Sequence, residues 1–275
     1  EVAYKRSFRV ILCNADNDPS KEDSYVRELR SYHIAGLLII PAAGADIASH
    51  LRAYASAEVP VVCIDRVPAG WKGDAVLVAN AEGAYLATRH LIQMGHKRLA
   101  VIAGPLGLTN AAERLKGFTR ALNEARIEIE PEFVQEARFD TESGYQAALR
   151  LLRMLPRPTA IFACNDLMAF GVLQAARELS LRCPEDLSIA GFDSLEFTKF
   201  TDPSLTSVYQ PGYQLGATAG RLLMQRIDGL RSAPKKVLLP TELKKRNSVG
   251  PPPAVAPESI ERTMSKGKHG GRRRR

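Results

Sequence analysis

The sequence from Pro158 to Gly171 reads Pro-Thr-Ala-Ile-Phe-Ala-Cys-Asn-Asp-Leu-Met-Ala-Phe-Gly. Ala160 to Cys164 is wholly apolar, which is typical of a strand buried on both faces of a parallel sheet. Asn165 and Asp166 then open an apolar-periodic segment that predicts a helix. Small ligands bind at such strand-to-helix passages in open α/β sheets, but Asn and Asp are also ordinary helix N-caps. Taken alone, this stretch favours caps over ligand contacts.

The same alternation of strands and helices runs through the folded region. Strands are predicted at Phe8–Cys13, Gly36–Pro41, Pro60–Asp65, Ala75–Ala79, Leu99–Ala103, Phe133–Val134, Ala160–Cys164, Leu187–Phe192, Thr206–Val208 and Lys236–Leu239. Helices are predicted from Asp18-Pro19, around Ile47, Leu51 and Tyr54, from Asn80, over Ala112–Leu122 and Thr141–Met154, from Asn165, and over Tyr213–Ile227. This order predicts an α/β fold of parallel sheets with helices on both faces. About ten strands are more than a single sheet of ordinary size contains, so two doubly wound lobes are expected.

The charge is unevenly distributed along the chain. Of the formal net charge of +8, +5 lies from Gly250 onward, where seven basic residues face two acidic ones. Residues 250–275 are rich in Pro, Gly, Lys and Arg and predict a disordered basic tail. Its Arg272–Arg275 run could touch nucleic acid through phosphates, but a solvated tail is the favoured interpretation.

Other global features indicate a cytoplasmic protein. No stretch approaches the roughly 20 apolar residues of a membrane span, and Glu1–Arg6 lacks the features of a signal peptide. The four cysteines are far apart and lie mostly in apolar runs, which indicates buried free thiols rather than disulfides or a metal site.

Polar residues follow three of the predicted strands at the point where each strand ends. Asp65 follows Pro60–Ile64, Asn165 follows Ala160–Cys164, and Asp193 follows Leu187–Phe192. In a parallel sheet these ends meet at one edge, so a single ligand could contact two carboxylates and an amide. Such groups suit hydroxyl-rich ligands. The occurrence of polar residues at three such strand ends favours a binding site. Asp166 then becomes the expected capping residue of the helix.

An enzyme is not expected from this sequence. Dinucleotide, P-loop, zinc-protease and hydrolase motifs are all missing, so neither a cofactor nor a metal is predicted. The histidines have no ligand spacing, and His90 and His96 fall at the end of a predicted helix, where a surface or helix-dipole role is favoured.

Several ordered runs resemble the LacI/GalR family of bacterial transcriptional repressors, over about residues 1–249. They are Asn80–Pro105, Arg114–Phe118, Phe139–Tyr145, Pro158–Gly171, Pro184–Asp193 and Pro203–Pro211. The resemblance implies a type I periplasmic-binding-protein-like effector domain of two lobes joined by three crossovers, near Val78–Ala79, Val208–Gly212 and Leu239–Thr241. The N-terminal lobe would comprise residues 1–78 and 212–239, and the C-terminal lobe residues 79–211 and 240–249.

The resemblance also implies a ligand, a partner and a set of site residues. A sugar or similar small metabolite would bind in the cleft of a homodimer and regulate DNA binding allosterically. Asp65 would accept hydrogen bonds from ligand hydroxyls, Arg114 would donate to ligand oxygens, and Phe139 would stack on the apolar face of the ligand. The polar ring would be completed by Asn165, Asp193 and Gln210.

The chain departs from the family pattern at its N-terminus. Family members begin with a helix-turn-helix headpiece and a first strand, and this sequence starts about one strand and most of a helix later. We therefore expect an N-terminally truncated domain that reaches operator DNA only through an upstream headpiece. The alternative is a solute-binding protein of a sugar transporter, for which an upstream signal peptide would be the distinguishing feature.

Overall fold

The computed structural model describes residues 1–42, 51, 54 and 59–254. Its helices are α1 (Pro19–Ser31), α3 (Asn80–Gln93), α4 (Thr109–Glu124), α5 (Thr141–Leu152), α6 (Asp166–Glu178) and α7 (Gly212–Ile227). Its strands are β1 (Leu37–Ile39), β2 (Val61–Ile64), β3 (Asp74–Val78), β4 (Leu99–Ala103), β5 (Val134–Glu136), β6 (Ala160–Ala163), β7 (Ser188–Asp193), β8 (Thr206–Tyr209), β9 (Lys236–Leu239) and β10 (Glu242–Lys244). Short 3-10 helices are η1 (Tyr4–Arg6), η2 (Pro131–Phe133) and η3 (Glu196–Lys199). No described helix is both long and apolar enough to span a bilayer.

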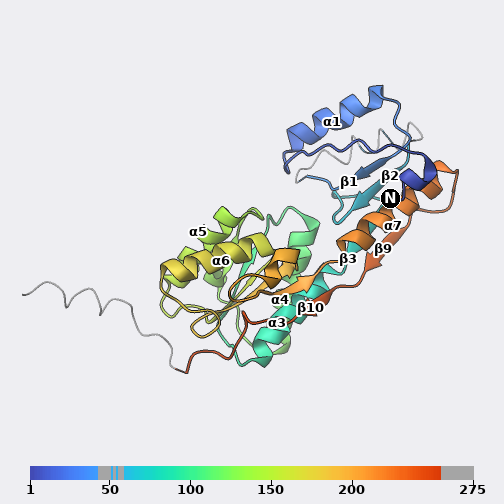
Figure 1. Cartoon of the computed structure of the whole chain (residues 1–275). Coiled ribbons are helices and arrows are strands. Elements are labelled where there is room, and N and C mark those ends of the chain that lie inside the picture. The colour runs from blue at the N-terminus through green and yellow to red at the C-terminus, as the bar shows by residue number, and fades with distance from the viewer. Residues whose placement is uncertain (43–50, 52–53, 55–58, 255–275) are drawn as a thin grey trace, which may run out of the picture.

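The strands form two separate sheets (Figure 1). The first has the order β1-β2-β3-β9, and the second has the order β10-β8-β7-β6-β4-β5. All pairings are parallel except that of β10 with β8, where Glu242 lies opposite Tyr209. The predicted α/β fold with parallel sheets is confirmed. The antiparallel edge strand β10 was not predicted, because its Glu-Leu-Lys sequence carries no apolar run.

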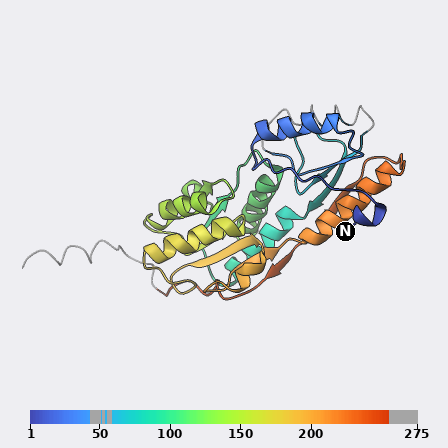
Figure 2. The same cartoon turned by 45° about the horizontal axis from the view of Figure 1, so that its top comes forward.

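Helices cover both faces of the second sheet, and we call this sheet with α3, α4, α5 and α6 the second lobe. Helix α3 packs against α4, and α5 packs against α6 (Figure 2). All four residues of β6 are buried, because successive side chains meet a helical layer on opposite faces. Phe162 of β6 stacks on Phe118 of α4, with ring centroids 6.4 Å apart. The prediction of a doubly covered strand in the opening stretch is confirmed.

The first sheet is sandwiched between α1 and α7, and we call these elements together the first lobe. Figures 1 and 2 show the two helices on opposite sides of the sheet. Val26 of α1 belongs to the same core cluster as Val61, whereas the next strand residue, Val62, packs with Leu222 of α7. Neighbouring valines thus enter different cores because side chains alternate along a strand.

The chain passes between the two lobes at three places. It leaves β3 at Val78 and enters α3, it returns between β8 and α7, and it crosses again between β9 and β10. The backbone N–H of Ala79 donates to the carbonyl of Leu239 at 2.9 Å, so the first and third crossings run side by side.

The strand predicted at Phe8–Cys13 is wrong. These residues form no strand, and Val10, Ile11 and Leu12 are 75%, 61% and 91% exposed. An apolar run becomes a strand only where a neighbour completes its backbone hydrogen bonds. Among the described residues no strand pairs with this run, and β1 is the edge of its sheet. Cys13 is consequently exposed rather than buried, unlike Cys63 and Cys164.

Two further predictions fall partly outside the described residues. The helix expected around Ile47, Leu51 and Tyr54 is one of them; only Leu51 and Tyr54 are described, and both are buried. The predicted basic tail begins at Gly250, whose N–H donates to Ser188 Oγ at 3.0 Å, and residues 255–275 lie outside the described part.

His96, expected at the surface, is 1% exposed and contacts the Gly250 carbonyl oxygen through Nε2 at 2.9 Å.

We expect Gly117→Ala to destabilise the second lobe. A Cβ at Gly117 on α4 would overlap the carbonyl oxygen of Ala81 on α3, and overpacking of this kind costs about 1–3 kcal/mol. Gly216 on α7 has no atom within 4 Å of the corresponding position, so Gly216→Ala is the matched control and should gain about 0.5–1 kcal/mol. Urea unfolding of both variants measures the two effects. Equal stabilities would show that α3 and α4 are not in close contact.

Candidate functional site

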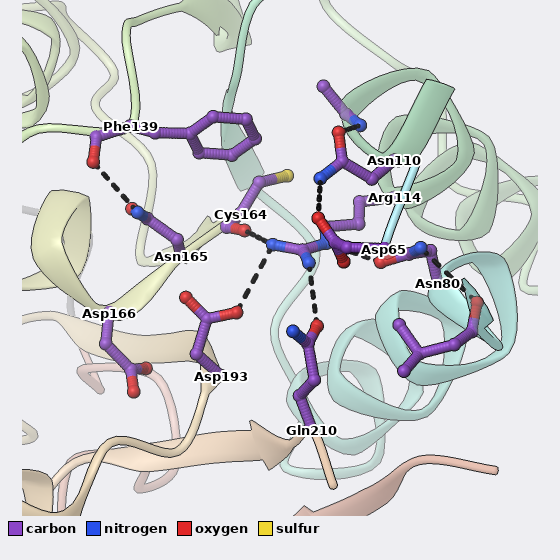
Figure 3. A network of polar contacts seen from close by, with 12 residues as sticks. Asp65, Asn80, Asn110, Arg114, Phe139, Cys164, Asn165, Asp166, Asp193 and Gln210 are labelled. Carbon is purple, nitrogen blue, oxygen red and sulfur yellow. Dashed lines mark hydrogen bonds and ion pairs between the residues drawn. The ribbon is translucent and has the colours of Figure 1, made fainter. Parts of the chain in front are cut away.

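Figure 3 shows all six predicted site residues close to one another in a network of polar contacts. Asp65 follows β2 of the first lobe, and the second lobe contributes the other five. Four of those five lie at or just after strand ends, namely Phe139, Asn165, Asp193 and Gln210, and Arg114 comes from α4. Because parallel strands share one carboxyl edge, the fold brings these residues together from distant parts of the sequence.

Arg114 is the centre of a polar network in the second lobe. Its side chain is 3% exposed, and its Nε donates to Asn80 Oδ1 at 2.8 Å. Nη1 donates to the Cys164 carbonyl at 2.6 Å, and Nη2 donates to Gln210 Oε1 at 3.2 Å. Nη1 also lies 3.6 Å from Asp193 Oδ1. One buried guanidinium therefore holds the ends of several elements in fixed positions.

Aromatic rings enclose the same guanidinium. Its central carbon lies 3.7 Å from the ring centroid of Phe192 and 5.8 Å from that of Phe139. The Phe139 ring also covers Gly104, where any Cβ would overlap it. Gly104 thus allows Phe139 to lie beside the arginine and to form an apolar wall of the network.

Asp193 is a carboxylate in an unfavourable electrostatic environment. Enclosure by the protein raises its pKa to about 7, with Asp166 and Asp65 adding to the rise and Arg114 opposing it. Its side chain is still 26% exposed, so a ligand could reach it. The group can accept hydrogen bonds as a carboxylate or donate one when protonated.

Asp166 is not the helix cap that we expected. It is fully buried, and its oxygens accept from Ser207 Oγ at 2.6 Å and from the N–H of Leu195 at 2.8 Å. Burial raises its pKa to about 6. The side chain therefore anchors the loop after β7 to β8, and this tertiary role was not visible in the sequence.

Asn165 performs the capping role instead. Its Oδ1 accepts from the N–H of Met168 at 2.9 Å, and its Nδ2 donates to the carbonyl of Phe139 at 2.9 Å. The cap interpretation of Asn165 is confirmed, and the second bond holds the Phe139 backbone to the start of α6. Contact between Asn165 and a ligand stays a prediction.

Two asparagines of this site were missed. Asn80 accepts from Arg114, and it could have been found because it follows β3 as the other polar residues follow their strands. Asn110, in the first turn of α4, donates from Nδ2 to Asp65 Oδ2 at 2.8 Å. Nothing in its sequence context indicates that role. The other oxygen of Asp65, Oδ1, is buried and has no partner within the described part of the chain.

The backbone at three site residues is in the left-handed region. The φ angles are 64° at Asp65, 64° at Phe139 and 104° at Asp193. Non-glycine residues rarely adopt such angles, each costs about 1–3 kcal/mol, and they cluster at ligand sites. The angles turn the side chains out of the alternation of the preceding strands, which places them where a ligand could touch them.

The chemistry available at this site is hydrogen bonding and stacking. The carboxylates of Asp65 and Asp193 can accept from hydroxyl groups, Arg114 supplies positive charge, and Phe139 supplies an aromatic face. No set of three or more His, Cys, Asp or Glu side chains among the described residues could hold a metal ion. The arrangement suits the recognition of a small polar molecule.

Comparison with protein-family models matches residues 88–249 to the periplasmic binding protein-like domain. Among characterised relatives, the HTH-type transcriptional repressor PurR of Haemophilus influenzae (strain PittEE) is 37% identical over 227 residues, which are 82% of this chain and 67% of the relative. The protein of the same name from Mannheimia succiniciproducens is 35% identical over 249 residues, covering 90% of this chain and 74% of the relative.

Solved structures show the same likeness. The transcriptional regulator CelR in complex with cellobiose superposes with a TM-score of 0.82 at 31% identity, covering 90% of this chain and 76% of that one. A LacI family regulator from Enterococcus faecium with bound ribose superposes with a TM-score of 0.79 at 31% identity, covering 91% of this chain and 90% of that one. The regulator CcpA of Lactococcus lactis superposes with a TM-score of 0.82 at 30% identity, covering 90% of each chain.

We expect Asp193→Asn to stabilise the ligand-free domain at high pH. The pKa of Asp193 is about 7 in the folded state and about 3.9 in an unfolded chain, so unfolding releases a proton between these values. Wild-type stability therefore falls as the pH rises from about 4 to 7. The variant has no titrating group at this position and does not lose this stability. Its free energy of unfolding should therefore exceed that of wild type by near zero at pH 4 and by at least about 1.4 kcal/mol at pH 8. Urea unfolding across this range measures the difference, and a pH-independent difference would contradict the raised pKa.

Proposed function

We propose a sugar or a closely related polyhydroxylated metabolite as the effector of this chain, which belongs to the LacI/GalR family of transcriptional regulators. The chain carries the effector-binding domain of a transcriptional repressor, as the match to the periplasmic binding protein-like domain and the PurR relatives establish. Its relatives are repressors and not enzymes, so the expectation of a non-enzyme is confirmed. The alternative of a transporter's solute-binding protein is not favoured.

The juxtaposition of carboxylates, one arginine and one aromatic ring carries the proposal of a sugar. Asp65 Oδ1 is buried without a partner among the described residues, and Asp193 is open to solvent, so both can accept from hydroxyl groups. Phe139 offers a flat apolar surface for the face of a sugar ring. Two structural relatives are named with sugars, cellobiose for CelR and ribose for the Enterococcus faecium regulator.

The charge balance of the site supports an uncharged ligand. The carboxylates of Asp65, Asp166 and Asp193 and the two buried arginines, Arg66 and Arg114, interact electrostatically in this region. Because these arginines do not outnumber the carboxylates, they leave no excess formal positive charge to attract a phosphate. A neutral polyol is therefore favoured over a sugar phosphate.

The two lobes are proposed as the moving parts of the regulator. One body would comprise residues 1–78 and 212–239, and the other residues 79–211 and 240–249, with the three crossings as the hinge. An effector that contacts Asp65 of the first lobe and Asp193 of the second would favour the closed arrangement. Closure would be transmitted across a homodimer to a helix-turn-helix headpiece, through which operator DNA would be bound. This role places the protein in the cytoplasm.

An aromatic patch on the second lobe is proposed as part of the homodimer interface. Phe197 and Phe200 of the η3 region are 49% and 81% exposed, and Leu167 at the start of α6 is 38% exposed. Phe197 lies against Phe170 of α6, with ring centroids 5.1 Å apart. A groove of about 410 Å³ lies beside this patch and is lined by Phe170, Leu173, Gln174, Arg177, Thr201 and Asp202. Exposed aromatic side chains next to a groove are typical of protein interfaces.

We expect Asp193→Ala to lower sugar affinity by one or more orders of magnitude. Loss of a charged hydrogen-bonding partner is worth about 1.5–3 kcal/mol, and every tenfold change in affinity is about 1.4 kcal/mol. Calorimetry with the sugar that gives the largest thermal shift in a panel containing ribose and cellobiose measures the effect. Asp228→Ala, at an exposed aspartate on the far end of α7, is the control and should bind as wild type. If no sugar in a broad panel shifts the wild-type melting temperature, the proposed ligand class is wrong.

We expect Phe200→Asp to shift the homodimer toward monomer. A charge in the centre of an apolar interface would have to be desolvated without a partner, and removal of an aromatic anchor alone costs at least about 2 kcal/mol at an interface hot spot. Sedimentation velocity over a concentration series measures the dissociation constant. Leu155→Asp places the same charge at another exposed apolar residue, 64% accessible, and should leave association unchanged. Equal behaviour of the two variants would place the interface elsewhere.

A further inference from the structure

A short side-chain hydrogen bond joins the two lobes at the site. Asn110 Nδ2, in the first turn of α4, donates to Asp65 Oδ2 at 2.8 Å, and Figure 3 shows the two side chains pointing toward one another. Weaker contacts support it, because Thr109 Oγ1 lies 3.3 Å from the N–H and 3.5 Å from the carbonyl of Val67. The start of α4 in the second lobe therefore lies against the end of β2 in the first.

The amide of Asn110 is held in one orientation. The residue is 4% exposed, and its Oδ1 accepts from the N–H of Ala111 at 2.9 Å. The opposite orientation would turn the amide oxygen toward the carboxylate of Asp65 and lose both bonds. A buried amide donor that faces an ionised acceptor makes one of the stronger hydrogen bonds available to a neutral side chain.

Asp65 uses only one of its oxygens within the described part of the chain. Asn110 holds Oδ2, and the buried Oδ1 has no partner there. The charge of Asp65 acts on Asp193, across the lobes, and raises its pKa. Oδ1 is therefore the acceptor that Asp65 has left for a ligand hydroxyl, which could donate to it without displacing Asn110.

We propose that Asn110 is a positioning residue that holds the two lobes together before an effector binds and aims Asp65 Oδ1 at the effector. The first half of this proposal concerns the effector-free protein and is independent of the effector's identity; the second half rests on the proposed function. The effector then adds a second hydrogen bond to a carboxylate that is already bridged. Closure is thus partly present without ligand, and the effector shifts an existing equilibrium.

The test is the distance between the lobes in the full-length, effector-free chain. Nitroxide labels at Ser24→Cys on α1 and Lys116→Cys on α4, both exposed, report this distance by pulsed electron resonance once Cys13 and Cys183 are changed to serine. In Asn110→Asp two carboxylates face each other, and we expect the ratio of closed to open populations to fall at least about tenfold. Asn123→Ala, at an exposed asparagine on the same helix, is the matched control and should match wild type.

A reversed pair separates positioning from a structural role. Combining Asn110→Asp with Asp65→Asn exchanges donor and acceptor, and asparagine tolerates the left-handed backbone of position 65. We expect the double variant to regain the closed population but not sugar binding, because the carboxylate has left the first lobe. The proposal is overturned if Asn110→Asp keeps the wild-type distance distribution, or if the reversed pair stays as open as the single variant. Absence of any sugar binding by wild type would reject the proposed effector class and leave the effector-free result intact.

Discussion

The buried charge of Arg114 is the constraint on which the second-lobe side of the site depends. A buried guanidinium is tolerated only where its donors and its charge are both matched. Asn80, the Cys164 carbonyl and Gln210 supply the acceptors, and Asp193 supplies a nearby negative charge. Asn80 and Gln210 border two of the three chain crossings between the lobes. The same interactions that satisfy the arginine therefore also order the crossings.

The site contains features that are energetically unfavourable in the effector-free domain. Asp65 and Asp193 sit at strand ends with left-handed backbone angles, and Asp193 carries a raised pKa. Each feature costs free energy in the effector-free domain, and each leaves a group able to accept a hydrogen bond from a ligand. An effector that satisfies these groups would recover part of that free energy. Binding and closure are thereby coupled through the same side chains.

Much of the architecture could be predicted because its signals are local. The apolar run Ala160–Cys164 and the periodic segment after it correctly predicted β6 and α6, and Asp18 with Pro19 correctly predicted the start of α1. The strand at Phe8–Cys13 was wrong because a strand also needs a neighbour, and apolar composition does not supply one. The antiparallel β10 was missed for the opposite reason, since its pairing with β8 and not its own composition makes it a strand.

The sequence by itself determined the α/β order, the family, and the idea that polar residues at strand ends form one site. These follow from hydrophobic periodicity and from the rule that parallel strands share a carboxyl edge. Only the tertiary structure decided what each polar side chain does. Asp166 anchors the loop after β7, and Asn110 reaches across to Asp65, whereas the cap that Asn165 forms on α6 was already indicated by the sequence. The reason is physical: a hydrogen bond depends on the position and orientation of two groups, and here the partners lie 29 and 45 residues apart, where sequence spacing carries no information about either.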